Sequence, residues 1–310
     1  HVSVALHIPR GWNAKDIPDQ TGKRFLITGG TSGIGKEAAR ELARNGAHVT
    51  ITARSARKAE AVLKEIAEDR LNFVELDLTD LSSIRKAARE LTDLYDVVIL
   101  NAGIMAIPFS KTADGFETQM GTNHLGHFAL AGLLKERVRS RFVTVSSTAH
   151  HMGNFGNGTE AEIREICLGT NKYGKWGAYG NSKLANLYFA FELERRARSN
   201  QWSFSSIAVH PGYSNTHLQL VASELRQAKT EQIITGFMNR VLAQSASQGA
   251  LPTLLAATHP DIWGGTFVSP NGFLEIRGTP KLTRAKKIAY DQNIATNLWR
   301  VSESLTDVRW

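Results

Sequence analysis

The 310-residue sequence has a single cysteine, Cys167, and no apolar run long enough to cross a membrane. One cysteine excludes an internal disulfide and is typical of a protein in a reducing compartment. A membrane-spanning helix needs about 20 consecutive apolar residues, so the sequence predicts no such span. Residues 1–20 also lack the basic-then-apolar pattern of a secretory signal. We therefore expect a cytoplasmic protein.

Acidic residues are in the minority, with 29 Asp and Glu against 37 Lys and Arg, which gives a net charge of +8. The basic residues are scattered along the chain. No window combines a Lys/Arg block with interleaved aromatic residues, the pattern that is typical of a nucleic-acid-binding groove. The basic balance fits a solvated surface, and we expect no nucleic acid among the partners.

Short apolar runs alternate with helical segments after residue 22. This alternation is typical of repeated βα units and a parallel sheet. The predicted strands are residues 24–28, 47–53, 72–76, 96–100, 141–145, 204–209 and 266–269. The predicted helices are residues 34–45, 56–69, 81–91, 116–137, 161–167, 179–198 and 248–258. The pattern predicts a doubly wound α/β fold, with about seven strands and with helices on both faces of the sheet.

Three segments fall outside this alternation. Residues 1–21 form an N-terminal extension, and residues of about 150–176 form an insertion that is rich in Gly and Asn at both ends. Insertions of this length in a compact fold are usually functional or mobile. Residues of about 213–245 are expected to form two helices of a small substrate lobe. We expect residues 1–310 to form one domain, because the chain length does not require a second core.

Glycines cluster in the turn between the first predicted strand and the first predicted helix, at residues 28–35. Glycine lets the backbone turn tightly and approach a pyrophosphate, and the following helix N-terminus supplies amide donors. Within a βαβ unit this turn predicts a dinucleotide site of Rossmann type, although an ordinary glycine-rich turn is the alternative. The residues expected to bind the cofactor here are Gly29, Thr31, Ser32, Gly33, Ile34 and Gly35.

Arg54 follows the second predicted strand, where enzymes that select NAD usually have an acidic residue. A guanidinium matches the 2′-phosphate of NADP through charge-assisted hydrogen bonds. We therefore expect NADP(H) as the preferred cofactor and NAD(H) as a possible one, with a solvated surface arginine as the alternative.

Two further segments follow predicted strands at the same edge of the sheet. Asp77 and Leu78 follow the third strand and are placed to meet the adenine, although a helix-capping turn explains them equally well. Asn101, Ala102 and Gly103 follow the fourth strand. Asn tolerates unusual backbone angles and Gly allows close approach to a ligand, so this segment predicts the edge of the cofactor site.

Tyr179 and Lys183 are four positions apart on a predicted helix, so their side chains lie on one face and can converge on one ligand. A free tyrosine has a pKa of about 10, whereas a proton donor near neutrality needs about 7. A nearby ammonium favours the phenolate and lowers that pKa. Together with the glycine turn, this pair predicts an acid–base site.

The motifs at residues 28–35, 101–103, 145–147 and 179–183 resemble, in this order, those of the short-chain dehydrogenases/reductases. The resemblance covers about residues 22–270. It implies a catalytic tetrad of Asn123, Ser147, Tyr179 and Lys183. It also implies that Pro211, Gly212 and Thr216 hold the nicotinamide carboxamide, and that Tyr179 and Lys183 contact the cofactor.

Residues 123–128 and the wide gap between Ser147 and Tyr179 resemble the branch of retinol dehydrogenases and protochlorophyllide-reductase-like enzymes. Residues 12–20 and 298–305 are similar to uncharacterised bacterial members. The vertebrate retinol enzymes usually carry an N-terminal membrane anchor, which this sequence does not show. We therefore expect a substrate other than a retinoid delivered by a membrane.

The resemblance implies hydride transfer between NADP(H) and a hydrophobic aldehyde or ketone, or the reverse reaction from an alcohol. Tyr179 is then the general acid/base, Lys183 holds the nicotinamide ribose, and Ser147 stabilises the developing alkoxide. Asn123 stabilises its helix and a water-mediated proton path. A non-catalytic NADP(H)-binding sensor or scaffold on the same fold is the alternative. Residues 116–137 and 179–198 often pair across a dimer interface in this family, so a monomer and a homodimer both stay open.

Bulky apolar residues could line a substrate pocket, although each of them suits a core position equally well: Phe155, Trp176, Tyr213, Phe237 and Met238. The histidines near the expected cleft, which are His124, His127, His150, His151 and His210, show no metal-ligand spacing. We therefore expect no metal. Cys167 has no partner base at a suitable spacing and is expected to be a core residue.

Overall fold

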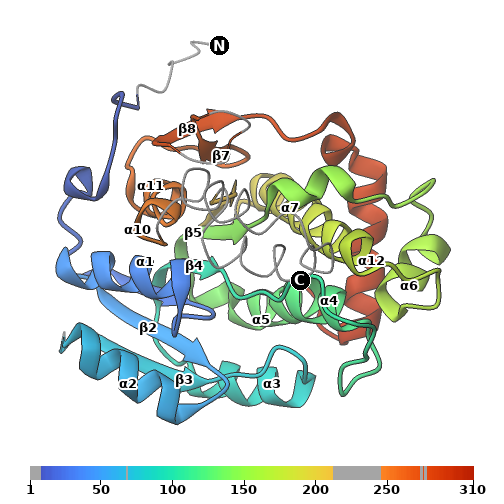
Figure 1. The fold of residues 1–310 in the computed structure, drawn as a ribbon, viewed down its shortest axis with the longest axis horizontal. Helices are drawn as coiled ribbons and strands as arrows, with labels where there is room; N and C mark the ends of the chain where they lie inside the picture. The colour runs from blue at the N-terminus through green and yellow to red at the C-terminus, as the bar shows by residue number, and fades with distance from the viewer. Residues whose placement is uncertain (1–7, 68, 212–245, 273–274, 276–277) are drawn as a thin grey trace, which may run out of the picture.

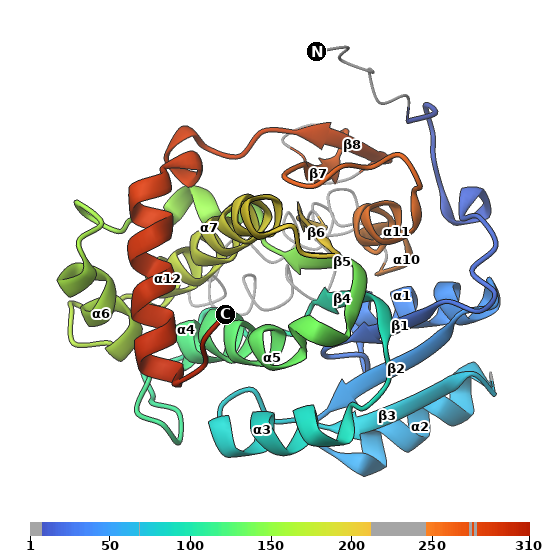
Figure 2. The ribbon, with the colours of Figure 1, turned by 180° about the vertical axis from the view of Figure 1, so that it is seen from behind.

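The computed structural model describes residues 8–67, 69–211, 246–272, 275 and 278–310, and it shows one sheet between two layers of helices (Figures 1 and 2). Within these ranges the sheet has eight strands in the order β3-β2-β1-β4-β5-β6-β7-β8. The strands are β1 (Arg24–Ile27), β2 (His48–Ala53), β3 (Leu71–Glu75), β4 (Tyr95–Leu100), β5 (Val138–Val145), β6 (Ser205–Val209), β7 (Phe267–Pro270) and β8 (Pro280–Thr283). Successive strands are added outward from β1 in both directions, so the order reverses between β1 and β4. Ligands of such sheets bind at this reversal, beyond the carboxyl ends of the strands.

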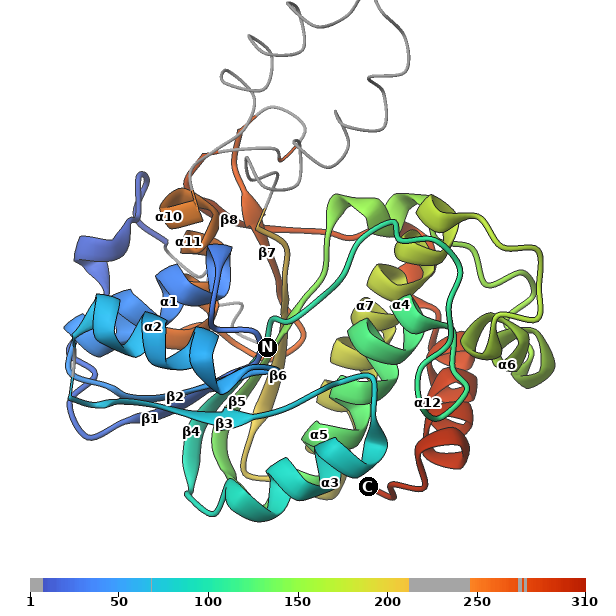
Figure 3. The same cartoon turned by 60° about the horizontal axis from the view of Figure 1, so that its bottom comes forward.

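The helices form two layers, as Figure 3 shows. The helices are α1 (Gly33–Arg44), α2 (Ala56–Ile66), α3 (Leu81–Glu90), α4 (Thr118–Met120), α5 (Gly126–Leu134), α6 (Glu160–Leu168), α7 (Lys175–Asn200), α10 (Ala246–Gly249), α11 (Leu251–Thr258) and α12 (Gln292–Thr306). Helices α1, α2, α10 and α11 cover one face, and α3, α5 and α7 cover the other. Of the helices in the described ranges, none combines the length and the apolar character that crossing a membrane requires.

The central strands are apolar on both faces because each face has its own core. In β1, Leu26 packs into the core beneath α3, α5 and α7, whereas Phe25 and Ile27 pack into the core beneath α1 and α11. All three side chains have no exposed surface. This is the expected pattern of a parallel strand that is buried on both sides. The predicted doubly wound α/β fold is therefore confirmed.

The sheet has one strand more than the sequence pattern predicts. β8 pairs antiparallel with β7, with Phe267 opposite Thr283 and Pro270 opposite Pro280. The other neighbouring strands pair in parallel. β8 is a four-residue edge strand of mixed polarity, so its sequence carries no apolar run that would have marked it.

The helix predicted over residues 116–137 is divided in the structure. Helix α4 is followed by a π-helical segment, Gly121–Leu125, then by α5 and by a 3₁₀ turn, Lys135–Arg137. Single π-helical turns are frequent at functional sites because they re-aim the side chains that follow. The π segment contains Asn123, whose orientation therefore differs from the one that a regular helix would give.

The insertion is folded. A 3₁₀ turn, Thr148–Met152, is followed by α6, whose N-terminus carries a capping box between Thr159 and Glu162. This confirms a short helix near residues 161–167. Helix α12, which the sequence pattern did not predict, packs on α6 and α7. The Asn297 side chain donates to the carbonyl of Gly158 at 2.9 Å, and this bond ties the insertion to α12.

Parts of the predicted periphery lie outside the described residues. These are residues 1–7 of the extension and the expected substrate lobe, together with Gly212, Tyr213, Thr216, Phe237 and Met238. In the described part of the extension, Trp12 is 2% exposed and packs with Ile17 into the core beneath α1. The extension therefore contributes to the core of the sheet.

Candidate cofactor and catalytic site

The glycine turn joins β1 to α1 at the reversal of the strand order. Gly29 has a φ of +71° and Gly33 a φ of +53°, which are backbone angles that glycine adopts without strain. A Cβ on Gly35 would lie 2.3 Å from the carbonyl oxygen of Gly29, so no side chain fits there. A Cβ on Gly33, at the first turn of α1, would meet no described atom within 4 Å. The turn therefore leaves open space at a helix N-terminus, which suits a pyrophosphate.

The segment after β4 is bound directly to this turn. The Thr28 hydroxyl oxygen accepts the backbone N–H groups of Asn101 at 2.9 Å and of Ala102 at 3.0 Å. The Asn101 side chain donates to the carbonyl of Thr28 at 3.0 Å. A Cβ on Gly29 would lie 2.9 Å from the Cα of Ala102. Two of the segments that the sequence predicts to bind the cofactor, residues 28–35 and 101–103, are therefore bonded together, and we call them the cofactor edge.

Arg54 stands at the end of β2, beside this edge. Its side chain is exposed, and it makes no ion pair with any residue in the described ranges. Asp77 accepts the backbone N–H of Thr79 at 2.9 Å and its hydroxyl at 2.7 Å, which is the geometry of a capping turn. Asp80 caps α3, and Leu78 is buried. Asp77 therefore shows the turn geometry that was its alternative interpretation.

Tyr179 and Lys183 lie on α7, and both are buried, at 2% and 4% exposure. The Lys183 Nζ is 5.7 Å from the centre of the Tyr179 ring and donates to the carbonyl of Val145 at 3.4 Å. Burial lowers the pKa of Lys183 to about 8. At pH 7 the side chain is therefore protonated in most molecules. A Cβ on Gly103 would lie 3.3 Å from Nζ. The ammonium therefore lies between the tyrosine and the segment after β4.

Two serines follow β5, and the structure gives them different roles. Ser146 is 2% exposed and donates to the carbonyl of Lys183 at 2.8 Å, so it anchors α7. Ser147 is half-buried, and its hydroxyl oxygen accepts the N–H of Ala149 at 3.2 Å as the cap of the following 3₁₀ turn. Among the described residues, no acceptor takes the hydrogen of this hydroxyl. This difference favours Ser147 over Ser146 for contact with a substrate oxygen.

Asn123 is fully buried and holds the chain that follows Gly103. Its side-chain oxygen accepts the N–H of Ile104, and its side-chain nitrogen donates to the Ile104 carbonyl, each at 2.9 Å. The same nitrogen donates to the hydroxyl of Ser182 at 2.9 Å. Asn123 therefore joins the segment after β4 to α7 at Ser182, the residue that precedes Lys183.

Comparison with known proteins agrees with this geometry. The family described as "short chain dehydrogenase" matches residues 23–159. Retinol dehydrogenase 12 of Homo sapiens is 38% identical over 93% of this chain and 88% of its own length. Short-chain dehydrogenase TIC 32 B, a chloroplastic protein of Brassica napus, is 34% identical over 91% of this chain and 88% of its own length. The chain belongs to the short-chain dehydrogenases/reductases.

A solved structure gives the same result for the fold. The crystal structure of an uncharacterised protein from Mycobacterium paratuberculosis is 39% identical, with a TM-score of 0.80 over 96% of this chain and 98% of that one. Short-chain dehydrogenases/reductases are oxidoreductases that bind nicotinamide cofactors. The 38% identity to retinol dehydrogenase 12 also confirms the resemblance to the retinol dehydrogenases that residues 123–128 suggested.

Two of the histidines that the sequence analysis singled out bond to other side chains. His124 lies 2.9 Å from the Ser302 hydroxyl, and His210 donates to Glu275 at 2.9 Å. Burial raises the pKa of Glu275, but hydrogen bonds from His210 and Thr283 outweigh it and lower that pKa to about 2. The bond from His210 connects Glu275 to the residue that follows β6. Sequence spacing gives no signal for it, because Glu275 is an isolated acidic residue in a loop.

Three other residues singled out from the sequence also belong to the core or its edge. Phe155 is 3% exposed and meets Tyr188 edge to face, so it is a core residue. Cys167 is fully buried, and burial raises its pKa to about 12, so it stays a thiol. Trp176 lies at the start of α7 with its ring 6.5 Å from the ring of Tyr179. Trp176 is therefore the one of these three that reaches the site.

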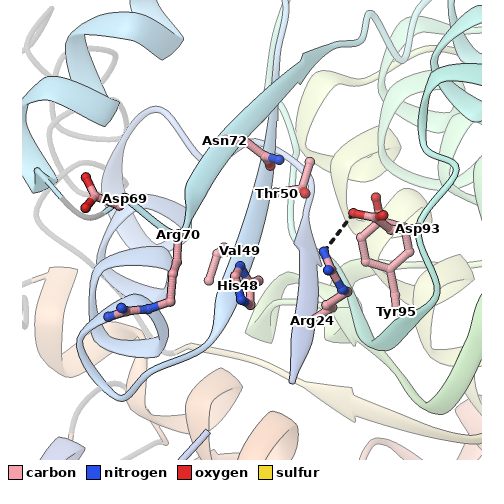
Figure 4. A pocket seen from close by; sticks show the side chains of 9 residues that line it. All are labelled: Arg24, His48, Val49, Thr50, Asp69, Arg70, Asn72, Asp93 and Tyr95. Atoms are coloured by element: carbon pink, nitrogen blue, oxygen red, sulfur yellow. Dashed lines mark hydrogen bonds and ion pairs between the residues drawn. The ribbon is translucent and has the colours of Figure 1, made fainter. Parts of the chain in front are cut away.

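A polar hollow lies at the opposite end of the sheet, at the amino ends of β1, β2 and β3 (Figure 4). Arg24 and Asp93 form an ion pair of 3.1 Å there, and both side chains are about half exposed, at 45% and 44%. Short-chain dehydrogenases/reductases share the general rule that parallel sheets bind ligands at the carboxyl ends of their strands. The hollow is therefore separate from the site of Tyr179 and Lys183.

Proposed function

We propose that this protein is an NADP(H)-dependent reductase or dehydrogenase that interconverts a hydrophobic aldehyde or ketone with the corresponding alcohol. The observation that carries the proposal is the buried Tyr179–Lys183 pair on α7. A charged ammonium is kept there next to a phenol, beside an open glycine turn. A buried charge is costly unless it has a partner or a function.

Tyr179 is the proton donor when a carbonyl is reduced, and it is the acceptor in the reverse direction. The Lys183 ammonium stabilises the phenolate through its positive charge. The Ser147 hydroxyl donates to the oxygen on which negative charge develops, and it is already oriented by the Ala149 N–H. Asn123 positions Lys183 and the segment after Gly103, and it supports the proton path that the resemblance implies.

The glycine turn, the segment at residues 101–103 and Arg54 are the parts of the chain that would hold the cofactor. When bound, NADP(H) supplies or accepts the hydride. The exposed guanidinium of Arg54 supports a preference for NADP(H) over NAD(H), because it matches a 2′-phosphate. Pro211, at the end of β6, begins the segment that is proposed to hold the carboxamide, together with Gly212 and Thr216.

A hydrophobic substrate is supported by the apolar character of the surroundings. Ile104 and Met105 are half-buried beside Asn123, and the Trp176 indole lies near Tyr179. Relatives that are named retinol dehydrogenases act, by that name, on a large apolar alcohol. A cytoplasmic location and the choice between monomer and homodimer stay predictions.

The first experiment is a competition between NADPH and NADH for the purified protein, followed by assays of NADPH oxidation with a panel of apolar aldehydes and ketones. We expect NADPH to bind at least about tenfold more tightly, which is about 1.4 kcal/mol. We expect Tyr179→Phe to lower kcat by at least about 10²-fold, the usual contribution of general acid–base catalysis, with the Kd for NADPH unchanged.

Unchanged turnover in this variant would contradict the mechanism. Cofactor binding without turnover of any substrate would support the sensor interpretation.

A further inference from the structure

His127 lies on α5, between the cofactor edge and the proposed catalytic residues, and it is 1% exposed. Its Nε2 is 2.8 Å from the hydroxyl oxygen of Thr28, which begins the glycine turn. Its Nδ1 is 3.0 Å from the backbone carbonyl oxygen of Asn123. One imidazole ring thus connects two segments that are far apart in the sequence.

The hydrogen-bond partners determine where the protons lie. The Thr28 oxygen already accepts the N–H groups of Asn101 and Ala102. The hydroxyl hydrogen of Thr28 is then the one group left to bridge to His127, so Nε2 is the acceptor. The Asn123 carbonyl can only accept, so Nδ1 carries the ring hydrogen. His127 is therefore neutral, which agrees with burial lowering its pKa to about 4.

We propose that His127 is a positioning residue that couples the cofactor edge to Asn123. The inference rests on the proposed function, because it assigns a role within that site. On one side, the bond to Thr28 fixes the hydroxyl that holds Asn101 and Ala102 against the glycine turn. On the other side, the bond to Asn123 fixes the backbone from which the Asn123 side chain holds Ile104 and Ser182.

The two bonds can be separated by substitution. In His127→Gln, the side-chain oxygen can reach the position of Nε2 and accept the Thr28 hydrogen, whereas the donor to Asn123 is lost. In His127→Asn, the shorter side chain can place a donor near the position of Nδ1, whereas the acceptor for Thr28 is lost. His127→Phe retains a ring and loses both bonds.

We expect His127→Gln to lower kcat for carbonyl reduction by about five- to tenfold and to keep the Kd for NADPH near its normal value. We expect the reverse for His127→Asn, with a raised Kd and a smaller effect on kcat. His127→Phe should change both quantities. A matched control is His124→Phe, which removes a buried histidine of the preceding π segment that bonds Ser302 instead. The control should lower the Tm. It should not change kcat alone or the Kd for NADPH alone.

The proposal is overturned if the Asn and Gln variants change kcat and Kd together, in proportion to their loss of Tm, as a purely structural residue would. A second measurement needs no variant. Nitrogen-15 NMR of the intact protein should show His127 with a protonated Nδ1 and a bare Nε2 between pH 5 and 8. The opposite tautomer also overturns the proposal. If the wild type reduces no carbonyl in the panel, the proposed function fails, whereas the NADPH affinities and the NMR result still test the coupling.

Discussion

We expect the proposed preference for NADP(H) to depend on Arg54. It is exposed at the end of β2, so its replacement changes few packing contacts. We expect Arg54→Ala to raise the Kd for NADPH by about tenfold or more, since a charge-assisted hydrogen bond to a phosphate is worth about 1.5–3 kcal/mol. The Kd for NADH should stay within about twofold, because NADH lacks the phosphate. Fluorescence titration with both cofactors measures the two constants.

The control for this comparison is Arg44→Ala, at the end of α1, which removes another exposed arginine. Its side chain pairs with Glu41 on the same helix. If both variants weaken NADPH binding equally, the effect reflects the overall positive charge and not recognition by Arg54. If neither variant changes the affinity, the 2′-phosphate has another partner.

Single residues of the site differ in how far the sequence could predict them. The glycine turn and the Tyr179–Lys183 pair are local patterns, because all their residues lie within one turn or one helix face. Ser147 could be preferred over Ser146 only from the family resemblance, and the cap of the 3₁₀ turn now supplies a physical reason. The bond between Thr28 and His127 spans 99 positions, and no spacing rule reaches across that distance.

Helix α7 shows how one element can contain two glycines with different constraints. A Cβ on Gly180 would lie 2.8 Å from the carbonyl oxygen of Ala149 and 2.9 Å from the nitrogen of Gly153. A Cβ on Gly177, one turn earlier, would meet no described atom within 4 Å. The helix therefore approaches the backbone after Ser147 closely at residue 180 and lies open at residue 177.

We expect Gly180→Ala to destabilise the protein by about 1–3 kcal/mol, the usual cost of overpacking. It should also lower kcat, because the turn that orients Ser147 is pushed away from α7. Gly177→Ala is the matched control, and it should be neutral or stabilise the protein by up to about 1 kcal/mol through helix propensity. Urea unfolding measures both free energies. Equal stability of the two variants would show that the close approach at residue 180 is not rigid.

At the scale of elements, the sequence predicts the central strands and the helices between them. It does not predict β8 or the π segment. The central strands are recognisable because burial on both faces demands continuous apolar runs. β8 is short, and its position depends on pairing with β7 rather than on its own composition. The π segment at Asn123 results from one additional residue in a helical turn, which no periodicity of 3.6 reveals.

At the scale of the whole molecule, three buried histidines make the free energy of unfolding depend on pH. Burial lowers the pKa of His124 to about 3, and those of His127 and His150 to about 4, from 6.5. The unfolded chain therefore binds more protons than the folded protein between pH 6.5 and 4. Stability is complete above about pH 6.5 and falls as the pH decreases, by about 3 kcal/mol for each histidine at pH 4.

Urea unfolding at several pH values between 7 and 4 tests this expectation. The slope of the unfolding free energy with pH should correspond to about three protons from these histidines, in addition to the contribution of carboxylates at the acid end. His124→Phe should reduce the slope by about one proton. A slope that does not differ between this variant and the unsubstituted protein would contradict the burial argument.

Helix α12 packs on both α5 and α7. Trp299 on α12 is 2% exposed, stacks on Phe189 of α7 at 5.8 Å and meets Phe128 of α5 edge to face at 5.1 Å. The Arg196 guanidinium lies 4.4 Å from the centre of the same indole. Helix α12 therefore covers the two helices that often pair across a dimer interface in this family.

We expect the 310-residue chain to sediment as a monomer at micromolar concentration, because a dimer through α5 and α7 would first have to displace α12. Replacing Trp299 by Ala should cost about 3–5 kcal/mol of stability, the usual range for a buried tryptophan. Trp263→Ala is the control, since Trp263 is 46% exposed and its loss should be small. Removal of residues 292–310 exposes the aromatic surface of α5 and α7, so the truncated chain should dimerise or aggregate. A dimer of the 310-residue chain that persists in Trp299→Ala would place the interface elsewhere on the molecule.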